Sequence, residues 1–192
     1  MSQNLDDGAS DAQVIEASLS DSEQFRVIFE RYYDVIYRYL VRRGGIEVGA
    51  EAASETFVVA FSHRKRYDTA YRSAKPWLFG IASNLLRNQL RRDAVRRTKP
   101  LPTNSDTGEF VDDVAWRTDA QRLVQKAGLV AAIDALRPDE REILFLYAFG
   151  DLTYTEIAQI VDCPVGTVRS RLSRLRQRLF VPLREALSEE PP

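Results

Sequence analysis

The stretch that decides the fold is LTYTEIAQIVDCPVGTVRSRLSRLRQRLF, residues 152–180. Thr153 or Thr155 can cap a short helix at its start. Pro164 cannot continue the helix before it, but it can open the next one. The apolar residues after the proline recur on one face of a helix: Val168, Leu172, Leu175 and Leu179. The stretch therefore predicts two short helices joined by a tight turn, a helix-turn-helix.

Basic residues occupy the other faces of the second predicted helix: Arg169, Arg171, Arg174, Arg176 and Arg178. An arginine fork can read guanine edges bidentately, and it can also neutralise phosphates. Ser170 and Ser173 are small enough to let the helix approach base edges closely. The alternative is an ordinary solvated amphipathic helix. The arginine and serine pattern favours a helix that docks in the DNA major groove.

A second helical region lies upstream, in residues 25–97. Aromatic residues at helical spacing predict a helix that starts at Phe25 and ends at Gly44-Gly45. A second helix is expected over residues 48–61, followed by a polar loop at residues 62–74. Pro76 suits the first turn of a third helix, over residues 77–97, which ends in a run of arginines.

The segment between the two helical regions, residues 98–122, has two prolines, small polar residues and acids. Such a length without periodicity is typical of a linker. We therefore predict an all-α protein of two small helical domains joined by a flexible acidic linker. The predicted domains span 25–97 and 123–187, with a flexible acidic extension at 1–24 and a tail at 188–192.

The net charge of −1 hides a strong segregation along the chain. Residues 1–24 carry six acidic and no basic side chains, whereas residues 25–100 carry sixteen basic and seven acidic ones. A near-neutral total argues against indiscriminate binding to nucleic acid, but a local basic face permits it.

The sequence lacks the signals that are typical of several functional classes of protein. No apolar run is long enough to span a bilayer, and the N-terminus lacks a secretory pattern, so we expect no membrane insertion and a cytoplasmic location. Cys163 is the only cysteine, which excludes an internal disulfide and a cysteine metal cluster. The single histidine, His63, has no evident partner. We expect no catalytic residues, no metal and no cofactor.

Three segments carry a resemblance to a known family. EIAQIVDCPVGTVRSRLSRLRQRL, residues 156–179, closely resembles the promoter-reading region four of extracytoplasmic-function (ECF) bacterial RNA polymerase sigma factors. GAEAASETFVVAF, residues 49–61, looks like the polymerase-clamp-binding helix of their region two. PWLFGIASNLLRNQLRR, residues 76–92, looks like the helix that opens the promoter. The resemblance implies a sigma factor, which directs promoter-specific initiation and is not an enzyme.

The resemblance implies that region four reads the distal (−35) element of double-stranded promoter DNA. Base reading would fall to Arg169, Ser170, Ser173 and Arg174. Arg171 and Arg176 would serve phosphates or packing.

For the proximal (−10) element, Asn84 matches an asparagine beside the flipped base of the single-stranded non-template strand. The loop at 62–74 matches the loop that confers base specificity, and its Tyr67, Tyr71 and Arg72 can stack on an unpaired base. Arg87 and Arg91 belong to the basic end of the promoter-opening helix. Trp77 and Phe79 are alternative stacking residues, although core packing is the commoner role for a tryptophan at that position.

The resemblance also implies protein partners. Glu51, Ser54, Glu55 and Phe57 match the helix that contacts the clamp of the β′ subunit of core RNA polymerase, and region four would contact the β flap. The family commonly has aspartate, leucine and glutamine where this chain has Glu51, Ala52 and Ser54. An anti-sigma factor is a further expected partner. The acidic linker is expected to mimic phosphate charge in a polymerase channel, through Asp106, Glu109, Asp112 and Asp113.

Two other interpretations compete with the sigma factor. A conventional DNA-binding regulator would carry a sensor or receiver domain, and residues 25–97 show no alternation of strands and helices. A sigma mimic that sequesters an anti-sigma factor has no need for a basic recognition helix, yet Arg169, Arg171 and Arg174 are present.

Overall fold

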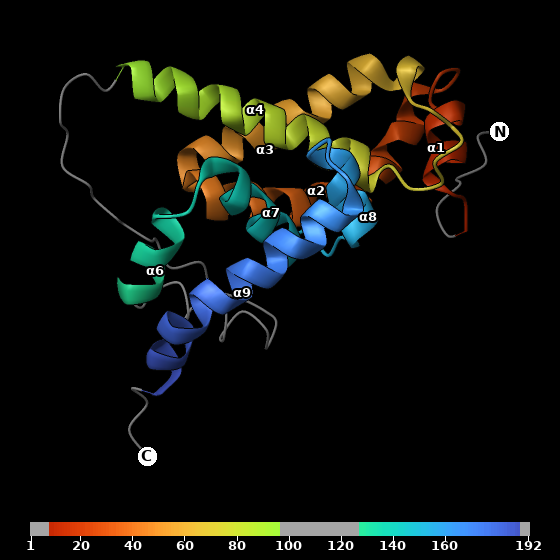
Figure 1. The fold of residues 1–192 in the computed structure, drawn as a ribbon. Coiled ribbons are helices and arrows are strands. Elements are labelled where there is room, and N and C mark those ends of the chain that lie inside the picture. The colour runs from red at the N-terminus through yellow and green to blue at the C-terminus, as the bar shows by residue number, and fades with distance from the viewer. Residues whose placement is uncertain (1–7, 97–126, 189–192) are drawn as a thin grey trace.

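The computed structural model describes residues 8–96 and 127–188, with side chains described for residues 8–92 and 130–180. The predicted all-α class is confirmed, since the described residues contain helices and no strand (Figure 1). The first half holds α1 (Asp11–Ala17), the 3-10 helix η1 (Ser22–Gln24), α2 (Phe25–Gly44), α3 (Ile46–His63), the 3-10 helix η2 (Arg64–Arg66) and α4 (Lys75–Arg96). The second half holds α6 (Ala127–Asp134), α7 (Pro138–Phe149), α8 (Tyr154–Ile160) and α9 (Val165–Ser188).

The junction between α2 and α3 depends on two glycines. Gly45 has a φ of 82°, a conformation that side chains with a Cβ rarely adopt, and it reverses the chain between the helices. At Gly49, a Cβ would lie 2.5 Å from the backbone N and Cα of Val41. The two helices can therefore cross closely only because residue 49 has no side chain.

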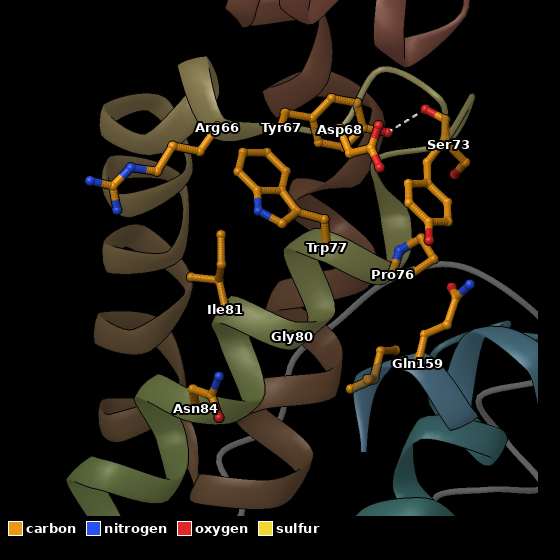
Figure 2. Close-up of a pocket in the computed structure, with 12 residues that line it drawn as sticks. Arg66, Tyr67, Asp68, Ser73, Pro76, Trp77, Gly80, Ile81, Asn84 and Gln159 are labelled. Carbon is orange, nitrogen blue, oxygen red and sulfur yellow. Dashed lines mark hydrogen bonds between the residues drawn. The ribbon is translucent and has the colours of Figure 1, made fainter. Parts of the chain in front are cut away.

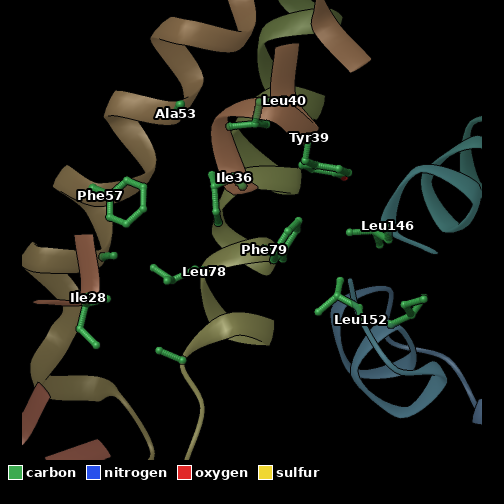
Figure 3. Close-up of a cluster of buried hydrophobic side chains, with 14 of the residues drawn as sticks. Ile28, Ile36, Tyr39, Leu40, Ala53, Phe57, Leu78, Phe79, Leu146 and Leu152 are labelled. Atoms are coloured by element: carbon green, nitrogen blue, oxygen red, sulfur yellow. The ribbon is translucent and has the colours of Figure 1, made fainter. Parts of the chain in front are cut away.

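The core of the first half lies between α2, α3 and α4, which pack against one another. Apolar residues at helical spacing on each helix face inward, and the largest of them are fully buried. Figure 3 shows this cluster, which includes Ile28, Ile36, Leu40, Ala53, Phe57 and Leu78. Removing apolar surface from water stabilises the fold by about 25 cal/mol per Å². This hydrophobic effect is the main force that holds the three helices together.

The helix-turn-helix is present as predicted, except that its second helix is not short, because α9 has 24 residues. Thr153 is the N-cap of α8, and it forms a capping box with Glu156. The chain then turns at Asp162, which has a φ of 49°, and the Cys163 N–H donates to the Ala158 carbonyl over 3.0 Å. Pro164 precedes α9, as expected.

The two halves share a continuous hydrophobic core. Leu146 of α7 and Leu152, in the turn before α8, lie opposite Tyr39 of α2 and Phe79 of α4 (Figure 3). The rings of Tyr39 and Phe79 meet edge to face, with 5.1 Å between their centroids. Region 138–160 therefore packs directly on α2 and α4.

The expectation of a flexible segment at residues 1–24 is wrong for part of that segment. Residues 11–17 form α1, whose Val14 and Ile15 are buried against the first core. A capping box of Ser10 and Gln13 stabilises its start, and helix formation buries enough apolar surface to offset the loss of chain entropy. Residues 1–7, the predicted linker at 98–122 with Asp106, Glu109, Asp112 and Asp113, and residues 189–192 lie outside the described residues.

Candidate nucleic-acid interface

The outer face of α9 presents four of the residues predicted to read duplex DNA. Arg169, Ser170, Ser173 and Arg174 are exposed, while Val168, Leu172 and Leu175 on the opposite face are buried. The Arg174 Nε donates to the Ser170 carbonyl over 3.3 Å, which holds the side chain along the helix. The result is a convex, basic helix surface with small residues between the arginines, a shape that fits a major groove.

The next arginines of α9 hold the helix to its own domain. Arg171 pairs with Asp139 of α7 over 3.1 Å. Arg176 donates to the hydroxyls of Tyr147 and Tyr154 over 2.8 and 3.1 Å, and its guanidinium also lies over the Tyr147 ring. Of the two roles that the resemblance implied for these arginines, the packing role is the one that their contacts fit.

A pocket of about 490 Å³ lies beside the first half of α4 (Figure 2). Its lining includes Tyr67, Tyr71 and Asn84 from the predicted −10 set. Tyr71 is 52% exposed, and Asn84 is also exposed on α4. The pocket combines an accessible aromatic ring with an amide that can pair with a base edge, so it can receive one unstacked base.

Tyr67 is already packed within the pocket wall. Its ring is nearly buried, lies 5.1 Å from the ring of Trp77, and its hydroxyl donates to the Tyr71 carbonyl over 2.6 Å. Burial, followed by the charge of Asp11, raises the pKa of Tyr67 to about 12, so the hydroxyl stays protonated and remains a donor. Phe79 is fully buried against Tyr39, and its alternative assignment as a stacking residue is wrong.

The remaining three residues of the predicted −10 set lie outside the pocket lining. Arg72 is exposed on the same loop, and Arg91 is exposed further along α4. Arg87 donates to both carboxylate oxygens of Glu142 on α7, each over 3.0 Å. Glu142 is 6% exposed and also lies 3.6 Å from Arg43 of α2.

The second half contributes to the pocket as well. Gln159 and Ile160 of α8 belong to its lining, and Figure 2 shows Gln159 across from the start of α4. Sequence reasoning missed these two residues and Glu142. Glu142 lies 55 positions from its partner Arg87, and a contact between residues so far apart in the sequence leaves no local signal. It also missed α1, for which Ser10 and Gln13 at capping-box spacing were a usable signal.

The residues predicted to contact polymerase lie on α3. Glu51, Ser54 and Glu55 are exposed, but Phe57 is buried against Phe29 and Tyr33 of α2. Beside them is an apolar groove of about 450 Å³, which the sequence did not predict. Its lining comprises Phe25, Phe29, Tyr33, Ser54, Phe57, Val58, Phe61 and Ser62.

The described residues lack two further kinds of feature, a metal-ligand cluster and a membrane-spanning helix. In residues 8–96 and 127–188, no group of histidine, cysteine, aspartate and glutamate side chains is placed to hold a metal ion. Within the same part of the chain, no helix is both long and apolar enough to cross a membrane.

Comparison with known proteins agrees with this arrangement. Residues 28–96 match the family described as Sigma-70 region 2, and residues 127–179 match Sigma-70, region 4. The chain is 31% identical over 166 residues to the ECF RNA polymerase sigma factor SigM of Bacillus subtilis, covering 85% of this chain and 97% of SigM. It is 27% identical over 176 residues to the ECF RNA polymerase sigma factor SigC of Mycobacterium tuberculosis, covering 91% of each.

Two solved structures share the fold. CnrH, in complex with the cytosolic domain of CnrY, superposes with a TM-score of 0.65 at 20% identity, covering 91% of this chain and 97% of CnrH. The sigma factor RpoE, in complex with the anti-sigma factor NepR from Bartonella quintana, gives a TM-score of 0.64 at 20% identity, covering 88% and 99%. With regions 2 and 4 both present and a relative covered almost end to end, the chain belongs to the ECF family of promoter-recognising RNA polymerase sigma factors.

Proposed function

We propose that the two halves of this sigma factor divide the promoter between them. α9 enters the major groove of the double-stranded −35 element, where Arg169, Ser170, Ser173 and Arg174 meet base edges. The pocket beside α4 takes an extruded base of the −10 non-template strand, with Asn84 on its edge and Tyr71 on its face.

The observation that carries this proposal is the contrast in shape between the two surfaces. The α9 surface at Arg169, Ser170, Ser173 and Arg174 is convex and basic, with small residues between the arginines, which suits duplex DNA. The α4 surface is a pocket with aromatic walls, which suits a single unstacked base. Each surface would be a poor receptor for the other form of DNA.

The pocket also gives a physical means of promoter opening. Breaking DNA stacking costs about 1–2 kcal/mol per base-pair step. A base held in the pocket favours the melted strand, and Arg91 and Arg92, exposed toward the end of α4, can neutralise its phosphates. A small sigma factor with few such contacts offsets the free-energy cost of opening only a few base-pair steps. It therefore requires a promoter close to its preferred sequence.

Core RNA polymerase supplies the chemistry, and the sigma factor itself acts by binding. We propose that the β′ clamp docks on the outer side of α3, at Glu51, Ser54 and Glu55, and along the groove beside Val58 and Phe61. The β flap would contact the second half. An anti-sigma factor is a further proposed partner, because the structural relative RpoE was solved in complex with the anti-sigma factor NepR.

In vitro transcription with core polymerase and randomised promoters tests the proposal. We expect one two-part promoter sequence, with Arg174→Ala relaxing selection only in the upstream part and Asn84→Ala only in the downstream part. Gln177→Ala and Asn88→Ala are matched controls, because both residues are exposed on the same two helices and Asn88 is outside the pocket lining. Binding of core polymerase without initiation would instead identify a sigma mimic.

A further inference from the structure

Asp11, the first residue of α1, is a buried carboxylate that joins three separate segments of the chain. It is 5% exposed. One carboxylate oxygen accepts from the Arg31 guanidinium over 2.9 Å. The other accepts from the Tyr32 hydroxyl over 2.5 Å and from the Ala74 N–H over 2.7 Å. Charge-assisted hydrogen bonds of this kind are roughly twice as strong as neutral ones.

Two of the hydrogen bonds of Asp11 hold the loop that precedes α4. Its backbone N–H donates to the Arg72 carbonyl over 3.1 Å, while its carboxylate accepts from Ala74 two residues further on. The loop from 72 to 74 is therefore fixed at both ends by one residue. α4 begins at the next position, Lys75.

The partners of Asp11 are themselves held in place. Arg31 also donates to the Ala9 carbonyl over 3.0 Å, and the Tyr32 hydroxyl lies 3.4 Å from the Ser73 hydroxyl. Burial, and next the hydrogen bond to Asp11, raises the pKa of Tyr32 to about 12. The tyrosine therefore stays protonated and donates to the carboxylate throughout the neutral range.

The loop that Asp11 fixes is a wall of the base pocket. Tyr71 and Ser73 line the pocket on either side of Arg72. The Tyr67 hydroxyl holds the Tyr71 carbonyl from one side, and Asp11 holds Arg72 and Ala74 from the other. The backbone at Tyr71 and just after it is thus held in place, and this sets the position of the exposed Tyr71 ring relative to Asn84.

We propose that Asp11 is a positioning residue for promoter reading, and that α1 belongs to the apparatus that selects the −10 base. Asp11 touches no DNA itself; it acts through the loop at 67–74 by holding Tyr71 and Ser73 against the pocket. This inference rests on the proposed function of the pocket as the receptor for an unpaired base.

The test uses holoenzyme made from core polymerase and the full chain, with Asp11→Ala and the isosteric Asp11→Asn. Promoters that differ only at the base selected through Asn84 are transcribed in competition. We expect Asp11→Ala to reduce the preference among these bases roughly tenfold, as for loss of one charge-assisted hydrogen bond. Asp11→Asn keeps the side-chain shape and should fall between the wild type and Asp11→Ala.

Asp21→Ala is the matched control for general destabilisation. Asp21 caps η1 in the same N-terminal region, through the Glu23 N–H and the Gln24 amide, and neither group belongs to the loop. Selection at the −35 element and binding to core polymerase are measured in the same reactions. We expect both to be unchanged by Asp11→Asn, and −10 selection to be unchanged by Asp21→Ala.

Two results would overturn the inference, and they are distinguishable. If Asn84→Ala relaxes −10 selection while both Asp11 variants select as the wild type does, Asp11 is only structural. If Asn84→Ala itself leaves −10 selection intact, the pocket does not read the base, and the proposed function fails together with this inference.

Discussion

The two surfaces proposed to read DNA differ in how far their side chains are already engaged within the chain. On α9, Arg169 and Arg174 are exposed, and the hydrogen bond from Arg174 stays within its own helix. On α4, Arg87 is bound to Glu142, and Gln159 of α8 forms part of the pocket lining. On the surface proposed to read duplex DNA, Arg169 and Arg174 are therefore exposed, and in the part of the chain that the structure describes neither forms an ion pair with the other half. The single-strand surface must exchange an internal contact before Arg87 can meet DNA.

The largest expected effect comes from removing the carboxylate between the halves. Glu142→Ala leaves Arg43, whose side chain is 8% exposed, without its buried counter-charge. Breaking a buried pair in this way costs about 3–5 kcal/mol. We expect urea denaturation to show a loss of that size, and small-angle scattering to show a larger radius of gyration as the halves separate.

Glu142→Gln separates charge from shape in this experiment, since it removes the negative charge but keeps the size of the side chain and an oxygen that can accept from Arg87. An unchanged radius in Glu142→Ala would mean that the apolar contact of Leu146 and Leu152 with Tyr39 and Phe79 holds the halves together unaided.

The next largest effect is a difference between Arg174 and Arg87 in their contribution to duplex binding. Arg174→Ala should weaken binding of the full chain to a −35 duplex by about 1–3 kcal/mol, the usual value of a base contact. Arg87→Ala should leave that affinity unchanged, because Arg87 faces the other half. Fluorescence anisotropy at fixed salt measures both. Equal losses would contradict a division of labour between the surfaces.

A smaller effect is expected from removing the N-cap of one helix in each half. Thr153→Ala removes the cap of α8, and Ser10→Ala removes the cap of α1, each at a cost of about 1 kcal/mol. Hydrogen exchange should show faster opening of α8 in the first variant and of α1 in the second. Loss of protection in both helices from either variant would show that the halves open as one unit.

The smallest effect concerns the ion pair of Lys75 with Asp151. Asp151 is almost fully exposed, so solvent screens the pair, and side-chain ordering cancels most of the gain. Asparagine tolerates the left-handed backbone that Asp151 adopts. We therefore expect Asp151→Asn to leave the midpoint of urea unfolding unchanged, whereas a clear shift would mark this pair as a real link between the halves.

Local signals in the sequence were sufficient to place the breaks between α2 and α3 and between α8 and α9. α2 ends at Gly44, as predicted, because Gly45 adopts a backbone that few other residues allow. Pro164 separates α8 from α9, as expected from its missing N–H. Both features depend on one or two neighbouring residues, so no tertiary information was needed.

Beyond the overlooked capping box of α1, the missed features depend on tertiary contact. α1 was not predicted because its apolar segment is short and lies among acidic residues, and it gains stability only when Val14 and Ile15 pack on the core. Phe79 was a candidate for stacking, since its position in an amphipathic pattern did not reveal that Tyr39 covers it. The pairing of Arg87 with Glu142 joins elements that are distant in the sequence. The run of arginines in the sequence gives no indication of such a partner.

The close crossing of α2 and α3 has a consequence for how this chain can evolve. At Gly49, even the methyl group of alanine would meet the Val41 backbone, which unlike a side chain cannot turn aside. Substitution would push α3 away from α2 and carry Glu51, Ser54 and Glu55 with it. Glu51, Ser54 and Glu55 are exposed, so substitutions there leave the crossing of the two helices intact. At position 49 the orientation of that whole surface depends on the absence of a single carbon atom.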